Sequence, residues 1–247
     1  MIDGPPAARA IDAPSPSLAA IAGKAWAFRH WVERDACARF ARMARRLEGI
    51  GTPASLVQKA REASEDEARH AVHCAELAAH YGHALAPNDP EPRELAPERF
   101  SDRQRVLYEV AAACLAESES SVMLVTLMQH AHAPKMKAVL RELSRDEVEH
   151  ARFGWAVLAS HRATDDLSFL AGAIPWMLST TAGDTFRPQT LGPEHDDLAE
   201  HGVLPYSLRR AVFIDALNDV VFPGLETLGI DAAPSRAWLA KLTAPET

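Results

Sequence analysis

The chain has 247 residues, of which 47% are hydrophobic, and its formal net charge is −8 at pH 7. This length suits one large domain, or one domain with a substantial addition, and the hydrophobic content is sufficient for a sizeable core. Ala, Leu, Arg and Glu dominate and β-branched residues are sparse, which favours an all-helical protein. The negative charge argues against a nucleic-acid partner, because such a surface needs basic residues that displace counterions.

The three cysteines, Cys37, Cys74 and Cys114, form no Cys-x-x-Cys motif. The sequence therefore contains no rubredoxin-type iron site and no zinc knuckle, and so few cysteines fit a reducing compartment. The N-terminus lacks the basic and apolar regions of a signal peptide. No stretch approaches the roughly 20 apolar residues of a membrane span. We therefore predict a cytoplasmic protein with no membrane partner.

In chain order, residues 1–17 contain four prolines and predict a mobile tail, with Ser17 as the N-cap of the first helix. That helix runs over about 18–47 and contains Glu33, which has aromatic residues seven positions away on either side. Glu33 is therefore expected on the apolar face. The glycines and proline of 49–53 end this helix.

The pattern predicts three further long helices, over about 54–81, 101–130 and 134–163. Ser101 and the glutamine three residues later look like a capping box at the start of the third helix. Residues 83–100 contain four prolines and cannot be helical, but they suit the single long crossover connection found in some four-helix bundles.

A six-residue motif occurs twice in this helical sequence. Asp66–Ala71 and Asp146–Ala151 both match Asp-Glu-x-x-His-Ala, and each follows a lone glutamate, Glu33 or Glu117. On a helix, Glu and His three residues apart lie on one face and can bind one metal ion together. In each helical hairpin the lone glutamate and the Glu-x-x-His lie at nearly equal distances from the turn, so they return to about the same height.

These residues predict a pair of metal ions inside a helical bundle. The predicted ligands are Glu33, Glu67, His70, Glu117, Glu147 and His150. Four ionised carboxylates in an interior would each cost several kcal/mol unless they were paired, and two divalent cations would neutralise them. Glu67 and Glu147 are the expected bridging pair. Carboxylate and imidazole ligands suit iron or manganese, so we predict two Fe ions, with Mn or a mixed Fe/Mn pair as alternatives.

Asp66 and Asp146 are expected to accept hydrogen bonds from the ligand histidines and so to fix their rings. Either Asp could serve its own histidine or the one on the facing helix. Glu119 competes with Glu117 as a ligand. However, two residues correspond to about 200° of rotation, and the apolar neighbours one turn away favour Glu117.

Several neighbouring residues have a simpler interpretation. His73 is expected to be an ordinary helix histidine, and Arg29, one turn before Glu33, is expected to form a structural salt bridge rather than to orient an acidic substrate. Small residues surround Glu33 and Glu117. They fit either a cavity for oxygen and a small substrate or close packing of the helices. Alternatively, these Glu and His residues could lie on solvent-exposed helix faces and bind no metal. The repeated motif and the matching heights of the glutamates and histidines in the two halves disfavour this alternative.

With these residues in view, the chain resembles the ferritin-like di-iron carboxylate superfamily of rubrerythrins and di-iron oxidases and hydroxylases. Glu33 and the run from Asp66 to His70 are similar to its E-x(n)-D-E-x-R-H signature, while the second half departs from it at Glu149. The resemblance covers about 18–162. It implies a four-helix bundle with one long crossover and a di-iron centre that handles dioxygen or peroxide.

We therefore expect three parts: a tail (1–17), a ferritin-like di-metal bundle (18–162) and a helical C-terminal extension (163–247). The first functional hypothesis is a di-iron oxidase or oxygenase that uses O2 or peroxide to oxidise a small organic substrate, with electrons from a separate reductase, from peroxide or from the substrate. The second is a ferroxidase, iron-storage or peroxide-detoxifying protein. The third is a binding or assembly protein with a structural metal site. A homodimer is possible.

Overall fold

The computed structural model describes residues 15–88, 90, 94–186 and 196–244, and within them it contains helices and no strand. The predicted all-helical class is confirmed. Four long helices come first in the chain: α1 (Pro16–Gly49), α2 (Ala54–His80), α3 (Asp102–His130) and α4 (Pro134–His161). Residues 1–14 of the predicted tail lie outside the described residues.

The starts of two helices show how local sequence sets their bounds. The hydroxyl of Ser15 accepts a hydrogen bond from the Leu18 backbone N–H, and Pro16 opens α1. The prediction of Ser17 as the N-cap is wrong, because proline has no N–H to lose at the first helical position and therefore extends the helix toward the N-terminus. The predicted capping box of Ser101 and Gln104 is confirmed at the start of α3.

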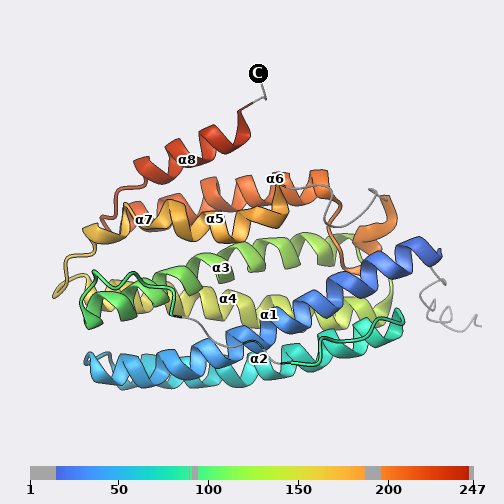
Figure 1. Cartoon of the computed structure of the whole chain (residues 1–247), viewed down its shortest axis with the longest axis horizontal. Coiled ribbons are helices and arrows are strands. Elements are labelled where there is room, and N and C mark those ends of the chain that lie inside the picture. The colour runs from blue at the N-terminus through green and yellow to red at the C-terminus, as the bar shows by residue number, and fades with distance from the viewer. Residues whose placement is uncertain (1–14, 89, 91–93, 187–195, 245–247) are drawn as a thin grey trace, which may run out of the picture.

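The long helices pack in antiparallel pairs, α1 along α2 and α3 along α4 (Figure 1). α2 also contacts α4, and α1 contacts α3, so the four helices enclose a common interior. Two apolar clusters fill its two ends. On α1, Trp26 belongs to one cluster and Phe40 to the other, and the buried Glu33 lies between them in sequence. The polar residues are thus held in the middle of an apolar interior.

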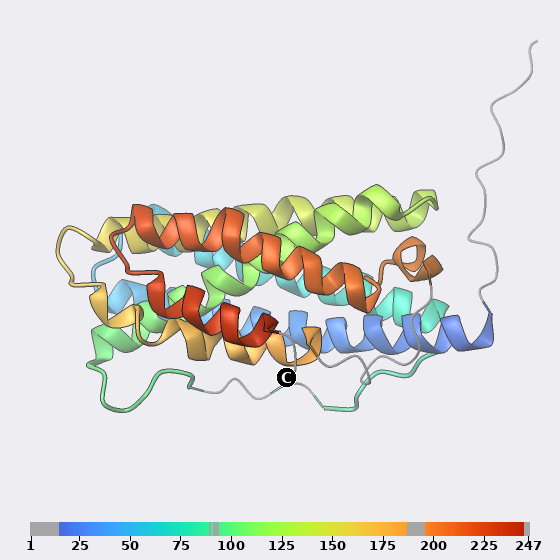
Figure 2. The same ribbon diagram turned by 90° about the horizontal axis from the view of Figure 1, so that it is seen from above.

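The C-terminal part adds shorter helices. They are η1 (Ser168–Leu170), α5 (Ile174–Thr185), η3 (Asp196–His201), α6 (Tyr206–Ala216), η4 (Leu217–Val221), α7 (Phe222–Thr227) and α8 (Ala233–Thr243). α5 and α6 pack on α3, and α8 contacts α5 (Figures 1 and 2). α3 is therefore covered on one side by its long neighbours and on the other by this C-terminal layer.

Two prolines of the C-terminal part lie in the first turns of helices. Pro175 lies in the first turn of α5, where the missing N–H breaks no helical hydrogen bond. Pro223 lies in the first turn of α7. The chain passes through the π-helical segment η4 immediately before α7, which adjusts the backbone hydrogen bonds around a residue that cannot donate one.

α3 also corrects the expectation that no stretch is apolar enough to cross a membrane. By length and composition it could do so, although 56% of its most apolar 18-residue window is buried inside the protein. A helix that is apolar on all sides is expected where it is covered on all sides, as α3 is between α1, α4, α5 and α6. One such helix is weak evidence for a membrane span.

Candidate metal site

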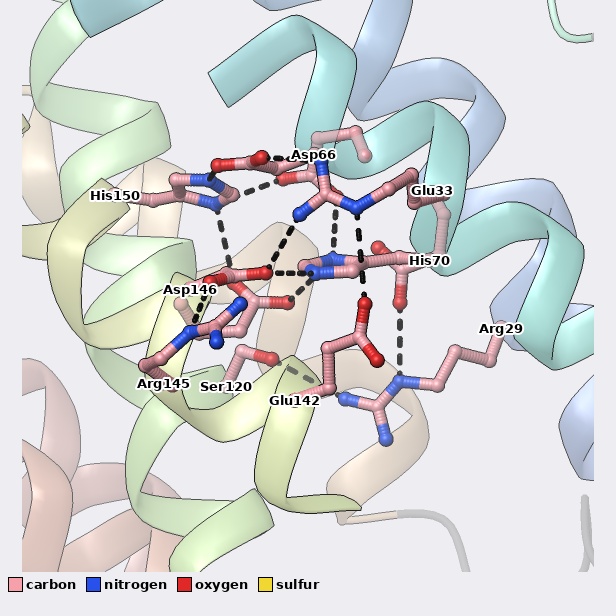
Figure 3. Close-up of polar contacts among 12 residues, drawn as sticks. Arg29, Glu33, Asp66, His70, Ser120, Glu142, Arg145, Asp146 and His150 are labelled. Carbon is pink, nitrogen blue, oxygen red and sulfur yellow. Dashed lines mark hydrogen bonds and ion pairs between the residues drawn. The ribbon is translucent and has the colours of Figure 1, made fainter. Parts of the chain in front are cut away.

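The structure brings all six predicted ligands into one buried cluster between the four long helices. Figure 3 shows three of them, Glu33, His70 and His150. They form two overlapping groups: Glu33, Glu67, His70 and Glu147, and Glu67, Glu117, Glu147 and His150. Within each group, one potential ligand atom from every residue lies within 4.8 Å of the others. Glu67 and Glu147 belong to both groups, which is the arrangement expected of bridging carboxylates.

The structure shows which aspartate contacts which ligand histidine, an alternative that the sequence left open. His70 Nε2 lies 3.3 Å from Asp146 Oδ2, and His150 Nε2 lies 3.3 Å from Asp66 Oδ2. Each aspartate therefore serves the histidine of the facing helix. An Nε2–H that donates to a carboxylate leaves the Nδ1 lone pair available. Both Nδ1 atoms face inward, 3.3 and 3.2 Å from the Glu67 carboxylate.

Arginines hold these aspartates from outside. Arg69 contacts Asp66 at 2.6 Å and Asp146 at 3.0 Å, so it links α2 to α4, and Arg145 contacts Asp146 at 2.8 Å. Glu149, where the sequence departs from the superfamily signature, pairs instead with Arg152 on the exposed surface. The second half therefore has no counterpart of Arg69 at that position, and Arg69 serves both aspartates.

Although both Nδ1 atoms lie within 3.3 Å of the Glu67 carboxylate, several polar atoms in the centre make no well-directed hydrogen bond. They are both carboxylate oxygens of Glu67, Oε2 of Glu147, and Nδ1 of His70 and of His150. A buried polar atom without a partner costs about 1–3 kcal/mol, and more when it is charged. Lone-pair atoms that converge in this way from two carboxylates and two imidazoles fit a divalent cation, which would satisfy them together.

The charges of the cluster also indicate competition between protons and cations. Burial, together with the nearby Glu67, raises the pKa of Glu33 well above its usual range, and burial with Glu147 does the same for Glu117. Burial alone would lower the pKa of His150, but the carboxylates of Glu147 and Glu67 raise it to about 12. Protons thus balance the negative charge here, and a cation would displace them.

Three other predictions concern residues around the cluster. Glu119 is buried, but it accepts a hydrogen bond from Thr181 Oγ1 on α5 at 3.3 Å and belongs to neither ligand group. His73 lies outside the cluster and contacts Glu142 at 3.3 Å. The predicted salt bridge of Arg29 is confirmed, since its Nε is 3.2 Å from Glu33 Oε1.

Next to Glu117 the helices pack closely. A Cβ added at Gly154 on α4 would lie 2.5 Å from Cys114 Cβ on α3. The small residues near this glutamate therefore serve close helix packing at this point, one of the two alternatives from the sequence. Sequence reasoning missed the role of Gly154. A glycine inside an otherwise strong helix pattern was the available signal.

Comparison with known proteins indicates a different function from the one that the repeated motif predicts. No family model matches the chain. Among curated proteins, sequences from Mycobacterium bovis (strain BCG / Pasteur 1173P2) and Mycobacterium tuberculosis (strain ATCC 25177 / H37Ra) are 39% identical to it over 69 residues. Both are named "Putative S-adenosyl-L-methionine-dependent methyltransferase". The match covers 28% of this chain and 22% of those proteins.

These names overturn three sequence predictions. A di-iron oxidase or oxygenase, or its ferroxidase alternative, is an oxidoreductase or iron-handling protein, whereas the matched proteins are named as methyltransferases. The predicted function is therefore wrong on this comparison, and with it the oxidoreductase class. The predicted cofactors, two Fe ions with Mn or mixed Fe/Mn as alternatives, are likewise wrong, because the named cosubstrate is S-adenosylmethionine.

Proposed function

We propose that this chain is a cation-binding helical protein whose buried carboxylate and imidazole cluster holds two divalent cations. The observation that carries the proposal is the set of unpartnered buried atoms on Glu67, Glu147, His70 and His150. Packing the four long helices as a ferritin-like bundle, with 83–100 as its long crossover, would place these atoms at one level. That arrangement and the superfamily resemblance support the proposal.

In this proposal each residue has a defined role. Glu67 and Glu147 would help to hold both cations, with His70 and Glu33 in one group and His150 and Glu117 in the other. Asp146 and Asp66 orient the two imidazoles from the facing helices. Bound divalent cations would supply positive charge and Lewis acidity. The protein's own residues fix the positions of the ions, and the two apolar clusters keep water away from them.

Metal analysis of the purified full-length protein tests this proposal. After removal of metal with a chelator and dialysis against Zn2+ or Co2+, we expect about two ions per chain, since there are two ligand groups. Glu67→Gln should reduce this number, whereas Glu149→Gln, a matched control on the exposed surface of α4, should not. Fewer than about one ion per chain in the wild type, or no effect of Glu67→Gln, would show that the cluster is not a cation site.

Methyl transfer is the second candidate, and the comparison with the mycobacterial proteins favours it. The described residues do not provide the usual setting for a nucleotide-like cosubstrate. In open α/β proteins such ligands bind at the carboxyl ends of parallel strands, and residues 15–88, 90, 94–186 and 196–244 contain no strand. We therefore derive no methyl-transfer step from this structure.

Calorimetry with S-adenosylmethionine separates the two candidates. The cation proposal predicts heat on addition of Zn2+ to the metal-free protein and none on addition of S-adenosylmethionine. Saturable binding of S-adenosylmethionine that is unaffected by Glu67→Gln would favour methyl transfer at a place other than the cluster.

A further inference from the structure

Arg29 contacts one half of the proposed cation site, the half that contains Glu33. Arg29 lies one turn before Glu33 on α1, and its Nε is 3.2 Å from Glu33 Oε1. It also donates from Nη2 to Ser120 Oγ on α3 at 3.2 Å, so its side chain is held between two helices (Figure 3). The side chains of Arg29 and Glu33 are 20% and 5% exposed. Salt therefore screens this pair less than a surface pair.

The other half differs at the equivalent position. Four residues before Glu117 on α3 stands Ala113, which has no charge. The charged groups that act most strongly on Glu117 are Glu147, Glu67 and His150, all of them members of the cation cluster itself. The ligand sets of the two halves match, because each has one lone glutamate, one histidine and the same two shared carboxylates.

We infer that Arg29 makes the two cation sites unequal, so that the group with Glu117 and His150 binds its ion first and more tightly, and the group with Glu33 and His70 binds second. This inference rests on the proposed function. A cation at the second group must share the Glu33 carboxylate with the Arg29 guanidinium, and two positive charges near one carboxylate repel each other.

Because both groups share Glu67 and Glu147, binding of the first cation affects the affinity for the second. The first ion reduces the negative charge of Glu67 and Glu147, and the second ion therefore binds to a less negative site whichever group it enters. Arg29 determines which group is second. Its contact with Ser120 holds the guanidinium beside Glu33 even when a cation competes for that carboxylate.

Calorimetric titration of metal-free full-length protein with Co2+ tests the inference. We expect two resolved binding steps in the wild type. Arg29→Gln should tighten the weaker step by about tenfold or more, the scale of one hydrogen bond to a charged group, and leave the tighter step nearly unchanged. Arg39→Gln is the matched control. Arg39 is also on α1 and also pairs with an acid four residues away, Asp35 at 2.8 Å, but neither residue belongs to the cluster.

Further variants identify the steps and guard against a folding defect. Arg29→Lys keeps the positive charge, so its weaker step should stay close to the wild-type value. Glu33→Gln should abolish the weaker step and Glu117→Gln the tighter one. Circular dichroism melting of each metal-free variant checks that it is folded. If Arg29→Gln fails to fold, the Glu33→Gln and Glu117→Gln titrations decide the order of the two steps.

The outcomes are distinct. If the wild type binds no Co2+, the proposed function fails. If it binds two ions with equal affinity, if Arg29→Gln tightens neither step or both alike, or if Glu33→Gln removes the tighter step, the cation site stands and the role of Arg29 is refuted.

Discussion

At the residue scale, the centre of this protein is organised by crossed hydrogen bonds. His70 of α2 contacts Asp146 of α4, and His150 of α4 contacts Asp66 of α2, both at 3.3 Å. Each imidazole is thereby fixed by the opposite helix, and a shift of α2 against α4 would disturb both rings together. The same contacts leave Nδ1 of each ring turned toward Glu67.

Removing one aspartate should weaken cation binding without removing a ligand. Asp146→Asn should lower cation affinity by about 10- to 100-fold, because the amide orients the His70 ring less well and no longer supports its basicity. Zn2+ calorimetry measures this change. Asp35→Asn, which breaks an ion pair on α1 outside the cluster, should have little effect. Equal affinities of Asp146→Asn and the wild type would contradict the role of the aspartate.

The cluster also predicts the pH dependence of the metal-free protein. Glu33 and Glu117 have raised pKa values, and the pKa of His150 is raised to about 12. A group with a raised folded-state pKa gives stability that is complete below its unfolded-state pKa and is lost as pH rises toward the folded value. The unfolded values are about 4.3 for Glu and 6.5 for His. His150 therefore predicts that stability falls between pH 6.5 and 9, and the raised pKa values of the two glutamates act in the same direction.

Urea unfolding of metal-free protein at pH 6.5 and pH 9 measures this trend. Saturating Zn2+ replaces the protons, so the stabilisation it gives should be larger at pH 9 than at pH 6.5. A metal-free protein that becomes more stable across this window would show that these groups do not hold their protons in the folded state.

At the element scale, helix contacts are set by small residues and by the coverage of α3. Gly154 on α4 allows the backbone of α3 to approach at Cys114, next to the cluster. α3 carries apolar residues on all sides because α5 and α6 cover the side that the long helices leave open. Glu119 is buried on the face of α3 that contacts α5, where it accepts a hydrogen bond from Thr181.

A side chain at Gly154 should separate α3 from α4. Gly154→Val would place its Cβ 2.5 Å from Cys114 Cβ, and overpacking of this kind destabilises by about 1–3 kcal/mol. Thermal and urea unfolding measure the loss. Gly172→Ala is the control, because a Cβ there meets nothing within 4 Å. Restoration of stability by adding Cys114→Gly would confirm the contact, and an unchanged melting temperature in Gly154→Val would refute it.

At the scale of the whole molecule, the C-terminal helices are part of the packing and not a separate attachment. Phe213 of α6 and Phe222 of α7 belong to the same buried cluster as Phe40 of α1. At the other end, the indole of Trp26 on α1 donates to the backbone carbonyl of His201 in η3 at 2.9 Å. Both ends of the long helices are therefore connected to the C-terminal layer.

Removing the C-terminal layer should expose apolar surface. A chain that ends at residue 163 leaves the α3 face that contacts α5 and α6 open to water, and we expect it to self-associate. Size-exclusion chromatography with light scattering measures this. A chain shortened only after Thr243, at the end of α8, should behave like the full-length protein. A monodisperse 1–163 fragment with the melting temperature of the full chain would contradict the prediction.

Sequence by itself determined the helical class, the bounds of the four long helices to within a few residues, and the residues that meet in the centre. Apolar periodicity and the repeated Asp-Glu-x-x-His-Ala motif depend on spacing along one helix, which the chain specifies locally. Only the tertiary structure decided which aspartate serves which histidine, that Glu119 faces α5, and that Gly154 meets Cys114. These contacts join helices far apart in sequence, and their geometry depends on how the helices rotate and approach when they pack.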